Sequence, residues 1–528
     1  MDPPNPRIRG HQSRAVSGSA NIPGNLTIND IPDEILLYII RWVPIYHKSD
    51  LSIVSYGQLS LRNLALCSRR FHQLVEPILY ERFYHNCHAP CNGIVMFLTR
   101  ILARPDLAKR VKAIHTTVTY GKLPSRGPFE MTCVNNDNWA RIKSKVAEAC
   151  HLRTHRDDWV EGIGLGFWQP IVALIITLTP NLEVLDFDHW NDEYVVPGPT
   201  TFGQLSLWWT IGQARMLQVD RQTKNPLGLW KLNSVQLGRS GGGWRFNIDR
   251  LLAFVTLPSL ETARAKYVNS RSITCDTRWH DSDLRFANVK ELSLTCTDVS
   301  PSAFAEYLGR FPNLNTLCYA IGDVSAAFEG LLPIQSVGSV LESISHLKPY
   351  LQDLTLLDLG CFDTYKHYTS WNLTWSLASF PALRRLDTTW LVLTGVKRES
   401  NAVNVFKNML DIVDVIPSSL EWLRVRDFHK LYKVHDVHTI PVYEQILLLL
   451  AQKHRFPALK QLDLGWERYR YNDRPWAREP FKFPGFTEEQ ALDVLAKCEE
   501  VSVEMVMMAV YEAMAWTAST GWCHRRPM

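Results

Sequence analysis

Ser240 has the surroundings in this 528-residue sequence that come closest to those of a catalytic nucleophile. It lies in Gly238-x-Ser240-x-Gly242, after an apolar segment typical of a strand and before one typical of a helix. A hydrolase nucleophile elbow has this spacing, but it passes directly into its helix, whereas residues through Phe246 intervene here. The glycines also lack the Lys-[Ser/Thr] ending of a phosphate-binding loop. A serine hydrolase is therefore the alternative interpretation, and nucleotide binding is less favoured still.

Two histidine-containing segments offer side chains that bind metals. Structural zinc sites draw pairs of ligands from two separated elements, and neither segment has an evident partner pair elsewhere in the sequence. We therefore expect ordinary loops, with no metal, no cofactor and no catalytic residue. The residues concerned are His85, Cys87, His88 and Cys91 in "HNCHAPC" and His435, Asp436 and His438 in "KVHDVH".

Composition restricts the class of protein. The sequence has 57 Lys+Arg against 53 Asp+Glu and no long block of like charge, so charge does not suggest nucleic acid or a membrane surface as a partner. Its 11 cysteines include no Cys-x-x-Cys pair and are typical of reduced, mostly buried thiols. Residues 1–25 favour a disordered tail without a signal-peptide core, and "IVALIITL" (171–178) is too short to span a bilayer. We expect a cytoplasmic or nuclear protein.

Two apolar segments near the N-terminus are typical of helices with more apolar surface than a helical pair can hide. In "NDIPDEILLYIIRWV", Asn29 or Asp30 can cap the helix, and Pro32 suits an early helical position. "LRNLALCSRRFHQLV" repeats apolar residues at helical spacing beside three arginines. A domain of about 50 residues hides only ~60% of its chain surface, so the remaining apolar face predicts either a partner or packing on the chain's own body.

The combined segment "IPDEILLYIIRWV...LSLRNLALCSRRFHQLVEPILYERF" resembles the F-box, with its Leu-Pro-x-Glu opening and its Leu-x-x-Cys-[Ser/Lys]-Arg-[Arg/Lys]-[Phe/Trp] second helix. The resemblance covers residues 26–84. It departs from the family at Ile31, where Leu is usual, and in the longer connection "PIYHKSDLSIVSYGQ". In that family the unit docks on a Skp-type adaptor. The resemblance implies that the docking residues here are Pro32, Ile35, Leu36, Ile39, Leu64, Cys67 and Phe71.

An internal repeat occupies most of the remaining chain. The template Pro-x-Leu-x-x-Leu-x-apolar appears in "TPNLEVLDF", "LPSLETARA", "FPNLNTLCY", "FPALRRLDT" and "FPALKQLDL", with degenerate copies between them. Each copy predicts that a helix ends before the Pro and that a short strand with alternate burial follows. The nine anchor aliphatic residues lie 25 to 50 residues apart, at positions 182, 232, 260, 289, 314, 351, 383, 420 and 459.

The segment "VKELSLTCTDVSPSAFAEYLGRFPNLNTL" contains one whole unit: a strand from Val289, a helix capped by Ser300 and ending near Arg310, and the next strand. We therefore predict an α/β fold in which an irregular leucine-rich-repeat-like βα solenoid occupies residues 105–466, with Val111 near its first strand. A doubly wound βα domain is the alternative. Recurrence of one break about nine times favours a stacked array with a long curved face.

Residues 467–528 depart from the template and are expected to cap the last repeat. They contain the aromatic and Arg-rich "WERYRYNDRPWAREPFKFPGF", and then Thr487 and Gln490 at capping-box spacing. Several tryptophans near the repeat strands are candidate anchors for a partner, or else fill gaps between unequal repeats. They are Trp190, Trp279, Trp371, Trp390 and Trp466.

Together these patterns predict a non-catalytic adaptor. By its resemblance to F-box proteins, most of all to those of the fungal type, the N-terminal helical domain would dock on a Skp-type adaptor and through it on a cullin ubiquitin ligase. The solenoid would then hold an unknown target protein. A repeat scaffold without a ligase connection, in which the N-terminal helices belong to the cap, is a further alternative beside the hydrolase.

Overall fold

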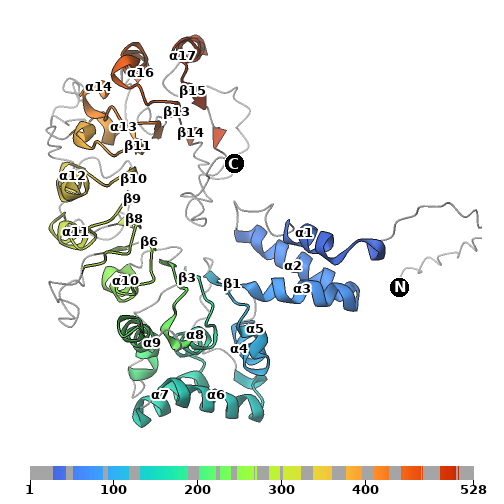
Figure 1. Ribbon diagram of the computed structural model, residues 1–528. Coiled ribbons are helices and arrows are strands. Elements are labelled where there is room, and N and C mark those ends of the chain that lie inside the picture. Colours follow the sequence, from blue (N-terminus) through green and yellow to red (C-terminus); the bar gives the residue numbers. More distant parts are fainter. Residues whose placement is uncertain are drawn as a thin grey trace, which may run out of the picture.

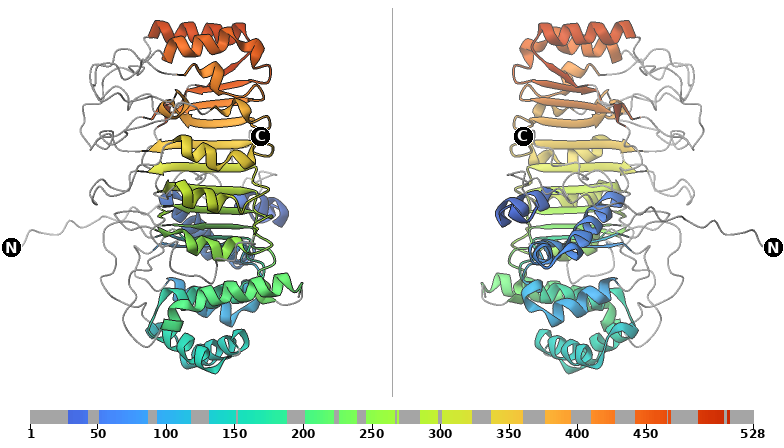
Figure 2. Two further views of the ribbon diagram at one scale, coloured as in Figure 1. Left: turned by 90° about the vertical axis from the view of Figure 1, so that its left-hand side faces the viewer. Right: turned by 90° about the vertical axis from the view of Figure 1, so that its right-hand side faces the viewer.

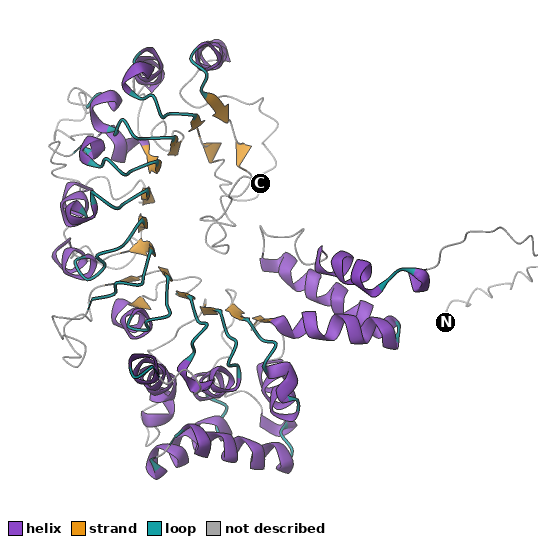
Figure 3. Cartoon of the chain, in the orientation of Figure 1, coloured by secondary structure: helices purple, strands orange, loops and turns teal. Residues whose placement is uncertain are grey.

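The chain forms a unit of three helices and a curved array of parallel strands with helices on its outer side (Figures 1 and 3). This array is called the solenoid below. The computed structural model describes residues 28–42, 51–86, 93–117, 131–150, 152–187, 201–221, 226–238, 246–266, 268–269, 285–297, 301–322, 337–359, 376–394, 410–426, 442–464, 466–467, 488–506 and 509–510.

The three-helix unit consists of α1 (Asp33–Trp42), α2 (Leu51–Cys67) and α3 (Arg69–Glu81). Two helices were expected, and the difference has two causes. Residues 51–58, expected as part of a connection, form the first half of α2. The second apolar segment is divided at Ser68, whose hydroxyl oxygen accepts a hydrogen bond from the Phe71 backbone N–H at 3.1 Å and so begins α3.

Twelve strands form one sheet in which neighbours run parallel and follow one another in chain order (Figure 2). A doubly wound sheet would reverse its strand order partway, so this order agrees with a repeat-like solenoid and confirms the α/β class. The strands are β1 (Arg82–Asn86), β2 (Ala113–Thr117), β3 (Val184–Phe187), β4 (Ser234–Leu237), β6 (Thr262–Lys266), β8 (Glu291–Thr297), β9 (Thr316–Gly322), β10 (Asp353–Leu359), β11 (Arg385–Thr389), β12 (Trp422–Arg426), β13 (Gln461–Leu464) and β15 (Glu504–Val506).

Each of the nine predicted repeat strands begins two residues after its anchor aliphatic residue, from Leu182 and Val184 to Leu459 and Gln461. The anchors are all buried. Each anchor therefore closes the turn that follows a helix and seals the core directly before the strand starts. The Pro-x-Leu break thus locates a strand even though the distance between copies varies.

The sheet extends beyond the predicted limits of residues 105 and 466. Its first strand is β1, which continues directly from α3, so residues 82–84 belong to the sheet and not only to the helical domain. Its last strand is β15, within the region expected to be a cap. Neither strand follows a helix that ends at Pro-x-Leu. Before β1, Pro77 and Leu79 lie inside α3, and the turn before β15 uses Ser502 at a φ of 58°. Residues 1–25 lie outside the described ranges.

One large hydrophobic core lies between the sheet and the outer helices (Figure 1). It includes the "IVALIITL" segment as a buried helix, as predicted. The helices are α4 (Gly93–Ala103), α5 (Pro105–Ala108), α6 (Asn136–Ala149), α7 (Arg153–Gly164), α8 (Trp168–Leu178), α9 (Thr201–Val219), α10 (Ile248–Val255), α11 (Pro301–Leu308), α12 (Val337–Ser343), α13 (Trp390–Thr394), α14 (Ile412–Val415), α16 (Val442–Ala451) and α17 (Glu488–Glu500).

Among the described helices, none alone has the length and apolar character needed to cross a membrane. Helices α7 and α8 have the required length and apolar character only when they are taken together, and the chain bends by 111° at the break between them.

A row of backbone hydrogen bonds runs the length of the sheet at the N-terminal ends of the strands. The carbonyl of Lys112 accepts from the N–H groups of Glu183 and Val184, at 2.7 and 2.9 Å. The same two-donor pattern recurs from β3 to β13, and the Lys460 carbonyl accepts from Glu504 at 2.8 Å. This row holds neighbouring repeats in register through main-chain atoms only.

Candidate functional site

The three-helix unit has a small hydrophobic core of its own. Two of the residues predicted to dock an adaptor, Leu36 and Phe71, lie inside it, and Leu64 is half-buried against it. These three side chains therefore stabilise the unit, and the prediction that Leu36 and Phe71 form its docking surface is wrong. The buried members of this core are Leu36, Ile40, Leu61, Ala65, Phe71 and Val75.

The other four predicted docking residues, Pro32, Ile35, Ile39 and Cys67, lie on the surface. On α1, Ile35 and Ile39 are 52% and 50% exposed, and Tyr38, which was not predicted, is 63% exposed. Their spacing of three, four and one residues places them on one side of the helix, opposite Leu36 and Ile40. We call Ile35, Tyr38 and Ile39 the α1 face.

The second helix also has apolar side chains in solvent. Leu59 and Leu66 are 49% and 76% exposed and lie seven residues apart, which is two helical turns. Neither was predicted as a docking residue. Assigning Leu61 and Ala65 to the core would have identified them, because Leu59 and Leu66 then lie on another side of α2.

Arg70 of α3 fixes the start of α1. Its Nε donates to Asp33 Oδ1 at 2.8 Å, and one terminal nitrogen donates to the backbone carbonyl of Ile31 at 2.5 Å. One of the arginines in the second apolar segment thus has a positioning role: it holds α1, and with it the α1 face, against α3.

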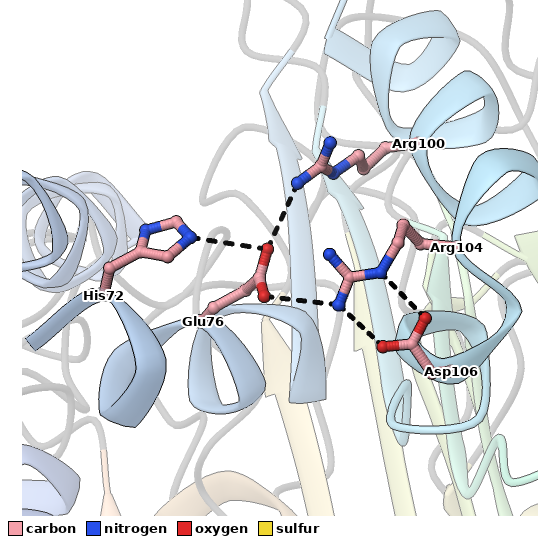
Figure 4. A network of polar contacts seen from close by, with 5 residues as sticks. All are labelled: His72, Glu76, Arg100, Arg104 and Asp106. Carbon is pink, nitrogen blue, oxygen red and sulfur yellow. Dashed lines mark hydrogen bonds and ion pairs between the residues drawn. The ribbon is translucent and has the colours of Figure 1, made fainter. Parts of the chain in front are cut away.

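Glu76 of α3 connects the three-helix unit to the solenoid (Figure 4). Its Oε1 accepts from Arg100 at 3.2 Å and lies 3.8 Å from His72 Nε2, and its Oε2 accepts from Arg104 at 3.5 Å. Arg104 also donates to both oxygens of Asp106, at 2.9 and 2.7 Å, and this hydrogen bonding lowers the pKa of the Asp106 carboxyl. Glu76 therefore binds α4 directly and, through Arg104, the start of α5.

Apolar packing strengthens the same junction. The Phe83 ring of β1 stacks on Phe97 of α4 with ring centroids 3.8 Å apart, and Tyr80 of α3 lies 6.1 Å from the Phe97 ring. Burial raises the pKa of the Tyr80 hydroxyl. Lys112 bonds Glu81 at 2.7 Å beside these rings. Helix α3 and strand β1 thus form one continuous piece that is packed on the first repeat.

The sheet has an inner face, opposite the helices, that lines the concave side of the arc (Figure 1). The second and fourth residues of the strands point into the core, as Leu185 and Phe187 do in β3. The first and third residues, such as Val184 and Asp186, therefore belong to the inner face. In a curved array this face is the extended surface on which repeat proteins bind their partners.

In the N-terminal half of the inner face, charged and polar groups bond to one another. Asp186 lies 3.2 Å from His115 Nδ1 and accepts from Gln236 Nε2 at 2.9 Å. Arg264 donates twice to one oxygen of Glu291, at 2.9 and 2.7 Å. These groups lie on consecutive strands, so they tie neighbouring repeats together.

In the C-terminal half, four charged side chains are nearly completely buried on the inner face. Arg426 donates two hydrogen bonds to Asp387, and Arg424 lies 3.0 Å from Asp463. Burial raises the pKa of Asp463, and the Arg424 charge opposes that rise. Two positive and two negative charges thus compensate one another across β11, β12 and β13.

The glycine that opens the G-x-S-x-G motif has a packing explanation. A Cβ at Gly238, directly after β4, would lie 2.7 Å from the Cβ of Lys266 at the end of β6. Only glycine permits this close approach of two repeat strands. Helix α10 begins at Ile248 and not directly after the motif, while Ser240 and Gly242 lie outside the described residues.

The candidate metal ligands are mostly outside the described residues, namely Cys87, His88, Cys91, His435, Asp436 and His438. His85 is described: it lies buried in β1, and burial lowers the pKa of its imidazole to about 4. Within the described ranges, no group of three His, Cys, Asp or Glu side chains is placed to hold a metal ion.

Of the tryptophans proposed as anchors for a partner, Trp390 is in the main core and fully buried, so its prediction as a surface anchor is wrong. It is the first residue of α13, and its burial agrees with the alternative that these tryptophans fill gaps in the array. Trp466 lies in the short strand β14 (Trp466–Glu467), and the other three lie outside the described residues. Trp422, the first residue of β12, lies on the inner face, and the sequence did not single it out.

Comparison with known proteins identifies no relative. No family model matches the sequence, and no curated protein matches it. A crystal structure of a protein from Bacteroides fragilis, a structural-genomics target, aligns with 16% sequence identity and a TM-score of 0.25 over 56% of this chain and 69% of that one. A TM-score of this size does not establish a common fold.

Proposed function

We propose that this protein is the target-recognition adaptor of a Skp–cullin–F-box type ubiquitin ligase. The observation that carries the proposal is the α1 face: Ile35, Tyr38 and Ile39 are exposed on a unit that already has a core of its own. Contiguous apolar side chains on a small exposed helical unit are typical of a protein-binding site.

The F-box resemblance of residues 26–84 supports a Skp-type adaptor as the partner, and the three-helix arrangement is compatible with it. The exposed members of the motif, Pro32, Ile35, Ile39 and Cys67, are then the residues that contact the adaptor, while Leu36 and Phe71 hold the helices together. Exposed Tyr38 joins the contact set.

The solenoid supports the second half of the proposal. Its inner face is long, curved and lined by polar and charged residues of successive strands. Such a face suits the binding of one protein by another. The protein itself is not an enzyme in this proposal, and partner enzymes of the ligase form the isopeptide bond. The proposal implies a cytoplasmic or nuclear location.

Co-purification with a Skp-type adaptor tests the proposal. Because Ile35 and Ile39 are half-exposed, Ile35→Asp and Ile39→Asp should leave the fold intact, as judged by circular dichroism. Each places a carboxylate in an apolar contact, which costs about 3 kcal/mol and should weaken adaptor binding by ~100-fold. Leu492→Asp, at a position of α17 that is 61% exposed, is the matched control and should bind as the wild type does.

Two outcomes would contradict the proposal. Wild-type protein that fails to bind any Skp-type adaptor would leave a repeat scaffold without a ligase connection. Unchanged binding by both α1-face variants would show that the adaptor, if bound, docks elsewhere.

A further inference from the structure

We propose that the inner face at the first residues of β10, β11 and β12 binds an acidic segment of a partner protein, with Arg385 anchoring a carboxylate and Trp422 beside it. The inference rests on the proposed function in one respect: it takes this partner protein to be the target of the ligase. Binding of an acidic peptide does not depend on the adaptor, so experiments can refute the inference and the proposed function separately.

The backbone places Arg385 and Trp422 side by side. They are paired residues of the adjacent parallel strands β11 and β12, and each is the first residue of its strand and thus belongs to the inner face. The guanidinium carbon of Arg385 lies 5.6 Å from the Trp422 ring centroid, and that of Arg424 lies 5.9 Å from it. A guanidinium held over an aromatic ring loses little further freedom when its N–H edge binds a ligand.

The Arg385 side chain also has hydrogen-bonding capacity left. It is 45% exposed, and its ion pair with Asp353 is 4.0 Å long, beyond hydrogen-bonding distance. The neighbouring Arg384 is 64% exposed and lies 3.7 Å from Glu421, which Lys460 already holds at 2.8 Å. Both guanidinium groups can therefore donate to an incoming carboxylate, for which their fork geometry is suited.

Other arginines of the inner face are already bonded to carboxylates of the chain at short distance. Arg264 donates two short hydrogen bonds to Glu291. Arg424 and Arg426 are buried against Asp463 and Asp387. The strand positions around Arg385 thus combine an exposed guanidinium, a long ion pair and an aromatic ring.

The local charge favours carboxylates over phosphate. The charged groups around Arg385 that are exposed or partly exposed are three basic side chains, Arg384, Arg385 and Lys460, and two acidic ones, Asp353 and Glu421, so their sum is 3 − 2 = +1. A phosphate group brings nearly two negative charges close to both carboxylates. Single carboxylates spaced along a peptide can instead lie between the acidic side chains.

Fluorescence anisotropy of labelled peptides with the full-length protein tests the inference. The probes are a peptide with alternating Asp and Glu, the same peptide with Asn and Gln in their place, and the neutral peptide with one phosphoserine. We expect binding of the acidic peptide above both others. Arg385→Gln should weaken it by about tenfold. Arg141→Gln, at an exposed position of α6, should leave it unchanged.

Equal binding of the acidic and neutral peptides would overturn the inference. So would tighter binding of the phosphopeptide, or equal losses in the Arg385→Gln and Arg141→Gln variants, which would indicate non-specific attraction. The Arg385→Gln variant should still co-purify with a Skp-type adaptor. If the wild-type protein binds the adaptor but not the acidic peptide, the inference alone is refuted. If it binds the acidic peptide but no Skp-type adaptor, the proposed function alone is refuted.

Discussion

Asp387 and Arg426 form an ion pair whose two members are nearly completely buried on adjacent strands of the sheet. Burial removes the hydration of both charges, and each helps to compensate the other. Removing one member of such a pair costs about 3–5 kcal/mol, whereas replacing both by apolar residues of similar size is often neutral. The pair therefore specifies which strands are neighbours more than it adds net stability.

Asp387→Ala should accordingly lower the free energy of unfolding by about 3 kcal/mol, because buried Arg426 loses the carboxylate to which it donates two hydrogen bonds. Asp387→Leu combined with Arg426→Met should recover most of that loss. Glu148→Ala, which removes the exposed partner of Lys145, is the control and should cost at most about 1 kcal/mol. Chemical denaturation of the four proteins measures these differences. A double variant no more stable than Asp387→Ala would contradict the expectation.

His85 makes stability depend on pH. Its folded-state pKa of about 4 lies below the ordinary value of 6.5, so between these two values the unfolded chain binds the extra proton. The stabilisation from neutral His85 is complete above pH 6.5 and is lost as the pH falls toward 4. At pH 5 the loss is about 2 kcal/mol.

We expect the thermal midpoint of the wild type to fall more between pH 7.5 and 5 than that of His85→Phe, whose ring is of similar size and does not titrate. Differential scanning calorimetry at the two pH values gives both midpoints. Parallel falls in the two proteins would show that another group is responsible.

At the scale of elements, the junction between α3 and the first repeat is held by one carboxylate and a group of rings. Glu76 accepts hydrogen bonds from Arg100 and Arg104, and Phe83 stacks on Phe97 beside them. The ion pairs are half-exposed and individually weak, but they act on an element that is already packed. Together they fix the direction in which the three-helix unit projects from the solenoid.

Glu76→Arg should loosen this junction, because it places three positive side chains together. Hydrogen exchange of the α3 backbone amides should become faster by several-fold, while exchange in β10 stays unchanged. Adding Arg100→Glu to this variant places a carboxylate opposite the new arginine at position 76. The exchange of the α3 amides should then become slower again. The control is Glu148→Arg on α6, which should not affect α3. The same exchange rates in wild type and Glu76→Arg would show that ring stacking alone holds the junction.

Much of the order of helices and strands was predictable from the sequence. The elements that were not predicted were missed for physical reasons. Wherever Pro-x-Leu ends a helix, the strand begins two residues after the anchor, as at Leu314 and Thr316. β1 and β15 lack that break and were missed. The third helix was missed because an insertion with helical character extended α2, and the Ser68 cap divided the second segment.

The candidate site was harder to predict than the fold. In α1, apolar residues occupy two sides of the helix, and periodicity alone does not tell which side faces the helical partner. Leu36 was therefore assigned to the docking surface together with Ile35 and Ile39, although it is in the small core. Trp422 and Arg385 come together only through the pairing of β11 with β12, which spans 37 residues of sequence (422 − 385).

At the scale of the whole molecule, the two hydrophobic cores are separate. The small core belongs to α1, α2 and α3, and the main core begins with residues of α4, with Tyr80 and Phe83 packed against it. The boundary between independently stable parts therefore falls within α3 and not at its end.

A chain that begins at Pro77 keeps Tyr80, Phe83 and all of β1, so its thermal midpoint should stay close to that of the solenoid in the full-length protein. A chain that begins at Gly93 loses β1 and leaves Phe97 uncovered, and it should melt earlier or aggregate. Calorimetry with light scattering compares the two. Similar melting of both truncated chains would place the boundary after β1.

The row of carbonyls that links Lys112 to Lys460 and Glu504 has a mechanical consequence. Strands run across the long axis of the molecule, so the hydrogen bonds between them lie along it (Figure 2). A force applied along that axis, as when a bound partner is pulled from one end, passes through these rows in series. Each row then bears the whole force, and the weakest row opens first. The solenoid should therefore behave as a soft spring that opens repeat by repeat at low force, and closes again when the tension is released.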